Sequence, residues 1–239
     1  MTLLTIAVAA ADEIGIDRPS SVISNPQPHV QKLLRYSNKV GTQLMKKVAW
    51  QVLRKEQTFT SVATETQTSI LPSDFDRFVP ETFWDRSASV LISGPISSVE
   101  WQGLKANSYS ISANPKFVYR GDAVLVIPTL AAGNTLAFEY VSNQWCESSG
   151  GTGQSSWAAD TDVGVIDEEL ITRGLKYTYL TDEGLPNASA ATEFEDYFNT
   201  LLENDQPNAG VMVAADIFGI GSRHFSGAPG VNNLASLLD

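Results

Sequence analysis

The sequence contains a single cysteine, Cys146, and only two histidines, His29 and His224. One cysteine excludes an intrachain disulfide framework and a cysteine-rich zinc or iron–sulfur site. Two histidines leave little for histidine-based catalysis, so we expect no metal and no cofactor. Because neither histidine is near Cys146 in the sequence, we interpret this thiol as a small, partly buried side chain rather than a nucleophile.

Basic residues are also scarce, since 16 Lys and Arg stand against 27 Asp and Glu and give a formal net charge of −11. A protein that binds duplex nucleic acid normally has a basic face, so this function is disfavoured for the chain as a whole. No run approaches the roughly 18–20 apolar residues of a membrane span. The apolar stretch near Met1 lacks preceding basic residues and meets Asp12 and Glu13, unlike a secretory signal. We therefore expect a soluble protein, made in the cytoplasm, with no membrane partner.

Motifs of nucleotide-binding proteins and hydrolases, such as GxxxxGKS/T, GxGxxG, GxSxG and HExxH, are absent from the sequence. The glycine-rich run 150–153 lacks the lysine of a phosphate-binding loop, and we interpret it as a flexible linker. Asp74 with Asp76, and the run Asp167–Glu169, would serve a carboxylate-dependent hydrolase only if they converged in a cleft. We prefer turn capping for the first pair and a favourable helix N-terminus for the second. The chain is therefore expected not to be an enzyme.

Helical periodicity is present at both ends of the chain. We expect Asp160 or Thr161 to cap the first helix of the C-terminal half. Residues 29–56 contain seven basic residues and one acidic residue, whereas residues 160–206 contain twelve acidic residues and two basic ones. Opposite charge predicts that these parts pack side by side, within one subunit or between neighbours. The segments with apolar residues at spacings of three and four are 3–16, 29–56, 160–184 and 189–204.

Charged side chains of both helical parts are candidates for contacts between subunits. The basic positions of residues 29–56 are interpreted as spread around the helix. This favours a solvated face, or packing against the acidic helices, over a helix that binds duplex DNA with sequence-specific contacts. A lining that tolerates passing double-stranded DNA, without sequence-specific contacts, is a separate alternative. The candidates are Lys32, Arg35, Lys39, Lys46, Lys47, Asp167, Glu168 and Glu169.

The middle of the chain is typical of β-structure. Residues 58–75 alternate with period two and are rich in Thr, which predicts two strands or a hairpin. Tyr119–Asp122 predicts a tight hairpin turn, and Ser97 or Ser98 is expected to cap a short helix. A dense aromatic group is interpreted mainly as a local core, with Trp84 as a candidate interface anchor. Its members are Phe75, Phe78, Phe83, Trp84 and Trp101.

These elements predict an α+β fold: a helical bundle formed by the N- and C-terminal segments, an inserted antiparallel β-rich domain and an extended C-terminal arm. The arm is too apolar for a solvated tail and too irregular for a core helix, so we expect it to order on a partner. The expected bounds are 1–56 and 149–206 for the bundle, 57–148 for the β-rich domain and 207–239 for the arm.

Residues 71–106 contain an acidic–aromatic loop, then Trp-Asp-Arg, Gly-Pro and Glu-Trp-Gln in that order. This block resembles one found in head-to-tail adaptor (connector) proteins of tailed bacteriophages. The resemblance covers roughly residues 1–205 and is a chain-long pattern, not a catalytic signature. Further matching stretches are Tyr119–Pro128, Ala132–Val141, Trp145, Asp160–Asp162, Asp167–Leu170 and Gly174–Lys176.

The resemblance implies a virion structural protein at the head–tail interface, made in the host cytoplasm. Such proteins form a twelve-subunit ring beneath the portal protein, extend the DNA channel and give a platform for the next tail protein (a nozzle, stopper or tail-tube protein). The alternatives are a virion-associated carboxylate-dependent hydrolase, or a different tail-completion or stopper ring protein, which would be mainly β. The C-terminal arm would dock on the portal, with Ile217, Phe218, His224, Phe225, Leu234, Leu237 and Leu238 as candidate contacts.

Overall fold

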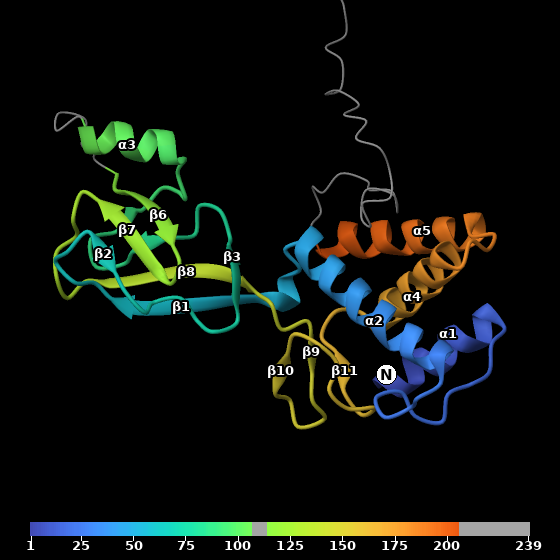
Figure 1. The fold of residues 1–239 in the computed structure, drawn as a ribbon. Coiled ribbons are helices and arrows are strands. Elements are labelled where there is room, and N and C mark those ends of the chain that lie inside the picture. The colour runs from blue at the N-terminus through green and yellow to red at the C-terminus, as the bar shows by residue number, and fades with distance from the viewer. Residues whose placement is uncertain (107–113, 206–239) are drawn as a thin grey trace, which may run out of the picture.

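The computed structural model describes residues 1–106 and 114–205. These residues form two lobes, each with its own hydrophobic core (Figure 1). We call residues 54–142 the β lobe, and residues 1–53 with 143–205 the helical lobe. The combination of helices with antiparallel strands confirms the α+β class.

In the helical lobe, α4 is the central element and contacts α1, α2 and α5. The first helix depends on the far end of the chain, because the amides of Leu3 and Leu4 donate to the carbonyls of Asp162 (2.8 Å) and Asp160 (3.1 Å). Among the described residues, the elements of this lobe are α1 (Leu3–Ile14), α2 (Pro28–Lys47), the 3-10 helix η1 (Gln51–Leu53), β9 (Cys146–Glu147), β10 (Gly153–Gln154), β11 (Val163–Gly164), α4 (Glu168–Asp182) and α5 (Ala188–Asp205).

The helix predicted for residues 29–56 ends at Lys47, so its predicted C-terminal part is wrong. Side chains from elsewhere satisfy the last carbonyls of α2 and stop the helix. The indole N–H of Trp50 donates to the carbonyl of Leu44 (3.0 Å), and the Arg77 guanidinium donates to the carbonyls of Met45 (3.1 Å) and Val48 (2.9 Å). The chain then turns into β1 at residue 54, inside the range predicted as helix.

The helix predicted for residues 160–184 starts at Glu168, so both predicted caps are also wrong. Asp167 is the N-cap, and its carboxylate accepts from the amide of Leu170 (2.8 Å). Asp160 instead accepts from the amides of Val22 and Ile23, which fixes the connection between α1 and α2. The acidic residue nearest to the true helix start is therefore the cap.

β8 is the central strand of the β lobe. It pairs with β1 along its length on one edge and with β3 and β4 on the other, all antiparallel. A second sheet has the order β2-β7-β6. Among the described residues, the elements are β1 (Arg54–Thr60), β2 (Thr66–Gln67), β3 (Phe75–Phe78), β4 (Trp84–Asp85), β5 (Val90–Leu91), α3 (Ser98–Ala106), β6 (Lys116–Arg120), β7 (Ala123–Ile127) and β8 (Thr135–Ser142).

Local predictions in this lobe are mostly confirmed. The turn at Tyr119–Asp122 joins β6 to β7, and the hydroxyl of Ser97 accepts from the amide of Glu100 (3.2 Å) at the start of α3. Residues 58–75 give two separate strands and not a hairpin, because β1 pairs with β8 and β2 pairs with β7. The predicted aromatic core is also present: three of its members, Phe75, Phe78 and Phe83, pack in the core of this lobe.

β8 carries the chain from one core into the other. Its Phe138 belongs to the core of the β lobe, whereas Val141 and the following Trp145 belong to the helical core. The Trp145 ring lies directly on Gly41 of α2, where an added Cβ would be 2.3–2.5 Å from three ring atoms. Glycine at position 41 is therefore required by this contact.

We predict that Gly41→Ala lowers the free energy of unfolding by about 1–3 kcal/mol through overpacking against Trp145, despite the better helix propensity of alanine. Urea unfolding followed by far-UV circular dichroism measures the change. Gly103→Ala in α3 is the matched control, because its Cβ would meet no atom within 4 Å. Equal stability of the two variants would contradict the proposed contact.

Candidate functional site

The first pair of candidate acids has structural partners. Asp74 is buried and accepts from the ammonium of Lys55 (2.7 Å), the hydroxyl of Ser142 (2.8 Å) and the hydroxyl of Tyr140 (3.0 Å). Burial opposes ionisation of Asp74, but these donors outweigh it and lower the pKa of its carboxyl group. Burial and, after it, the hydrogen bond to Asp74 raise the pKa of the Tyr140 hydroxyl. Asp74 is thus a fixed carboxylate that ties β3 to β1 and β8.

Asp76 belongs to the junction between the lobes. Its carboxylate pairs with the guanidinium of Arg77 (2.6 Å) and lies 3.8 Å from the ammonium of Lys46. Since Arg77 also holds the last carbonyls of α2, the pair fastens β3 to the C-terminus of that helix. This role is larger than the predicted turn capping.

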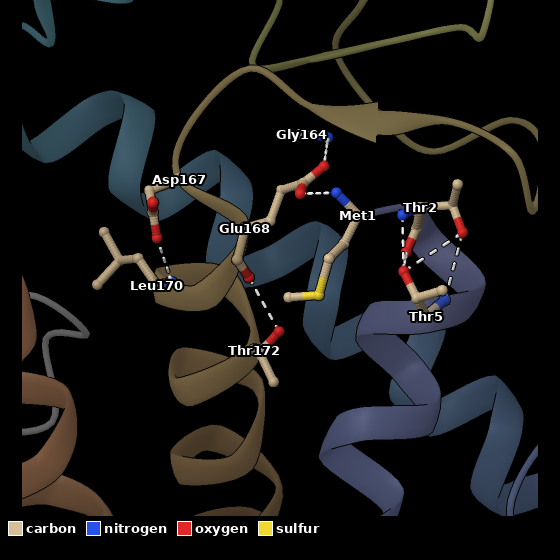
Figure 2. Close-up of polar contacts among 8 residues, drawn as sticks. All are labelled: Met1, Thr2, Thr5, Gly164, Asp167, Glu168, Leu170 and Thr172. Carbon is tan, nitrogen blue, oxygen red and sulfur yellow. Dashed lines mark hydrogen bonds and ion pairs between the residues drawn. The ribbon is translucent and has the colours of Figure 1, made fainter.

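The second group of acids lies around the N-terminus of α4 (Figure 2). Asp167 caps the helix, while Glu168 accepts from the ammonium group of Met1 and from the amide of Gly164 (3.3 Å). Glu169 accepts from Arg173 (2.8 Å) one turn further on. A negative first turn is the favourable arrangement predicted from the helix dipole.

These contacts weaken the hydrolase alternative. Asp74 and Asp76 lie in the β lobe, and neither lines the two pockets described below. Glu168 and Glu169 line neither pocket either, whereas Asp167 lines the second one. Each of the four carboxylates is already engaged by a donor of this chain, so the described residues hold no converging acid pair at these positions.

The basic residues of α2 form one stripe, which corrects the expectation that they are spread around the helix. At 100° per residue, Lys32, Arg35, Lys39, Lys46 and Lys47 fall within one third of the circumference, on the side away from most of the buried side chains. We call these five residues the basic stripe. Arg35, Lys39, Lys46 and Lys47 are exposed, and Lys32 is partly buried.

Acids of the same chain pair with part of the basic stripe. Lys32 pairs with Glu183, and Arg35 lies 3.8 Å from Asp182, both at the C-terminal end of α4. The attraction between the basic and acidic helices is therefore present within one subunit. Within residues 1–106 and 114–205, Lys39 and Lys47 have no ion-pair partner, so these two remain candidates for contacts with another molecule.

The candidate interface aromatic, Trp84, lies at the edge of a pocket of about 510 Å3 in the β lobe. Its side chain is 43% exposed, whereas Trp101, from the same predicted aromatic group, is fully buried. Four carboxylates and one guanidinium line the pocket, so it is strongly acidic. The charged lining residues are Glu56, Glu81, Asp85, Glu139 and Arg86.

The sheet register explains how this pocket forms. Trp84 of β4 pairs with Ala137 of β8, so both side chains lie on the same outer face of the sheet. Glu139 follows two residues later on that face, and Glu56 of β1 lies directly opposite it. Sequence reasoning found Trp84 but missed the acids, because no local pattern shows that β1 and β4 flank β8.

A second, more apolar pocket of about 280 Å3 lies where α5 meets the turn before β1. Trp50, Leu201 and Ile166 contribute to its lining, and Val52 at its edge is 56% exposed. Asp205 also lines this pocket, where its carboxylate accepts from the amide of Gln51 (3.1 Å). This pocket was not predicted.

Three further predictions concern Cys146, the glycine run and the arm. Cys146 is completely buried, and burial together with the Asp162 carboxylate raises the pKa of its thiol to about 12. Residues 150–153 are part of the ordered β9–β10 hairpin, where the amide of Gly151 donates to the carbonyl of Ser148 (2.8 Å), so the flexible-linker prediction is wrong. The candidate docking residues from Ile217 to Leu238 lie outside the described residues.

Two comparisons of the sequence with known proteins found no match. No family model matches it, and no curated protein matches it. Within residues 1–106 and 114–205, no group of three or more His, Cys, Asp and Glu side chains is arranged to hold a metal ion. Every helix in those same ranges is too short or too polar to cross a bilayer.

Asp74→Asn is predicted to lower the free energy of unfolding at pH 7 by about 1–3 kcal/mol, because it removes a buried charge that accepts three hydrogen bonds. Since the folded-state pKa is lowered, this contribution is present above the unfolded pKa of about 3.9 and is lost as pH falls through the folded value. The difference between wild type and variant should therefore shrink below about pH 4. Urea titrations across this range test it, with exposed Asp122→Asn as the control, and a pH-independent difference would contradict it.

Cys146 is predicted to resist alkylation in the folded protein, because its thiol is buried and its pKa is raised. Mass spectrometry after iodoacetamide treatment at pH 8 measures the labelled fraction, with the urea-unfolded chain as the control. Rapid labelling of the folded chain would reopen the interpretation of Cys146 as a nucleophile.

Proposed function

We propose that this protein is a non-enzymatic virion structural protein: a head-to-tail adaptor that assembles as a ring under the portal of a tailed bacteriophage. The observation that carries the proposal is the arrangement of the two lobes. Helices from both ends of the chain pack around α4, and the β lobe projects from them on β1 and β8 (Figure 1). A bundle with an inserted β domain is the layout that the resemblance of residues 71–106 implies.

The contacts of the candidate acids give further support. The hydrolase alternative depends on carboxylates such as Asp74 and Glu168 being free to act on a substrate, but each is engaged within the chain. Exposed charge of both signs suits a subunit that contacts neighbours on two different faces. The basic stripe of α2 and the acidic pocket at Trp84 are two such faces.

In this proposal the adaptor ring, expected to have twelve subunits, binds the portal protein on one side and the next tail protein on the other. Double-stranded DNA passes through the ring without sequence-specific contacts. Repeated weak contacts around the ring give strong overall attachment, because each bound subunit raises the effective concentration of the next. The predicted helices at both ends also favour an adaptor over a stopper ring, which would be mainly β.

The test is negative-stain imaging of the purified chain, alone and mixed with portal rings of the same phage. Rings stacked coaxially on one end of the portal are expected. Deletion of residues 208–239 should abolish the stacking if the C-terminal arm is the docking element. Stacking that survives the deletion would contradict docking by the C-terminal arm but remain consistent with the adaptor function. A well-folded chain that never binds the portal would contradict the proposed function.

A further inference from the structure

The pocket beside Trp84 has carboxylates that the chain leaves without a cation. Arg86 makes two hydrogen bonds to Glu56 (3.2 and 2.6 Å), which lowers the pKa of that carboxyl group. Within the described ranges, the carboxylates of Glu81 and Glu139 have no hydrogen-bond or ion-pair partner. One guanidinium therefore serves only one of the carboxylates around the opening.

The position of Glu139 identifies it as a carboxylate that a further cation could neutralise. It is partly buried and lies directly across the β1–β8 ladder from Glu56, whose charge Arg86 already compensates. A cation entering the pocket would pair with Glu139. Such a cation would also lie beside the exposed indole of Trp84, whose ring face attracts ammonium and guanidinium groups.

We infer that the Trp84 pocket is a docking site for lysine side chains of a second copy of this chain, donated by Lys39 and Lys47 of the basic stripe. Both lysines are exposed and lack an ion-pair partner within residues 1–106 and 114–205, so they match the unpaired carboxylates of the pocket in charge. The choice of a second copy as the occupant rests on the proposed function, in which subunits repeat around a ring.

The placement of the two surfaces permits a repeating contact. The pocket is lined by residues of β1, β4 and β8, and the basic stripe belongs to α2. β1 and β8 lie in one lobe and α2 in the other (Figure 1). A contact between two different surfaces of identical subunits is head-to-tail. Each subunit then offers one pocket and one basic stripe. The series of subunit contacts leaves no unused surface only when it closes into a ring.

The experiment uses two complementary full-length variants. In the first, Glu81→Lys and Glu139→Lys reverse the charge of two pocket residues and leave the basic stripe unchanged. In the second, Lys39→Glu and Lys47→Glu reverse the charge of two stripe residues and leave the pocket unchanged. Sedimentation velocity measures the assembly of each variant and of their mixture, at concentrations up to about 100 µM. Far-UV circular dichroism shows that both variants are folded.

Wild type is expected to form oligomers, and each variant alone should associate at least about tenfold more weakly. The mixture should give a one-to-one complex and nothing larger, because only one pocket and one stripe remain between the two partners. Adding Trp84→Ala to the second variant should abolish this complex. Asp122→Lys, at the exposed β6–β7 turn, matches each single Glu→Lys change in charge and should assemble like wild type.

A monomeric wild type, variants that assemble like wild type, or a mixture that fails to associate would each overturn the inference. These outcomes are distinct from failure of the proposed function. If the protein stacks on portal rings but its assembly is unchanged by these substitutions, the proposed function is supported and the docking site is contradicted. If assembly responds to the charge substitutions as expected but the protein never binds a portal, the docking site is supported and the proposed function is contradicted.

Discussion

The structure depends on the way β8 leaves one hydrophobic core and enters another. Its eight residues form the central strand of the β lobe. Trp145, which follows it, then packs directly against Gly41 in the helical lobe. Arg77 reinforces this junction from the β side, since its guanidinium satisfies the end of α2 and pairs with Asp76. The Arg77 hydrogen bonds therefore join the two lobes directly, whereas the Trp145 contact anchors the end of β8 within the helical lobe.

Some charged side chains of the molecule have ion-pair partners within the chain, and others have none. The carboxylates that first suggested chemistry, Asp74 and Glu168, hold strands and helix ends together. Charged side chains left without an ion-pair partner in the described residues include Glu139 beside Trp84 and Lys39 on α2. The net charge of −11 is therefore unevenly distributed, since a basic stripe and an acidic pocket lie on different parts of the molecule. This pattern suits a protein that works through contacts with other molecules.

The sequence predicted what local periodicity encodes. The starts of α1 and α2, the β6–β7 turn and the cap at Ser97 depend on neighbouring residues, and their predictions are confirmed. The end of α2 was mispredicted, because the side chain that stops it is Arg77, about thirty residues away. The caps at Asp160 and Thr161 failed for the same reason, since Asp160 is used by the distant turn at residues 22–23. The Trp84 pocket needs three strands at once, so no single segment shows it.

The dependence of α1 on the far end of the chain also bears on synthesis by the ribosome. The described core of the β lobe ends at Tyr140, so every strand that builds it emerges before α4 begins at residue 168. α1 and α2, made earlier, have no α4 to pack against at that stage. Domains generally fold as units during synthesis, and the β lobe is complete before α4 emerges, so the β lobe is expected to fold first. Residues 3–14 of α1 are therefore expected to become buried after the β lobe, although they are synthesised before it.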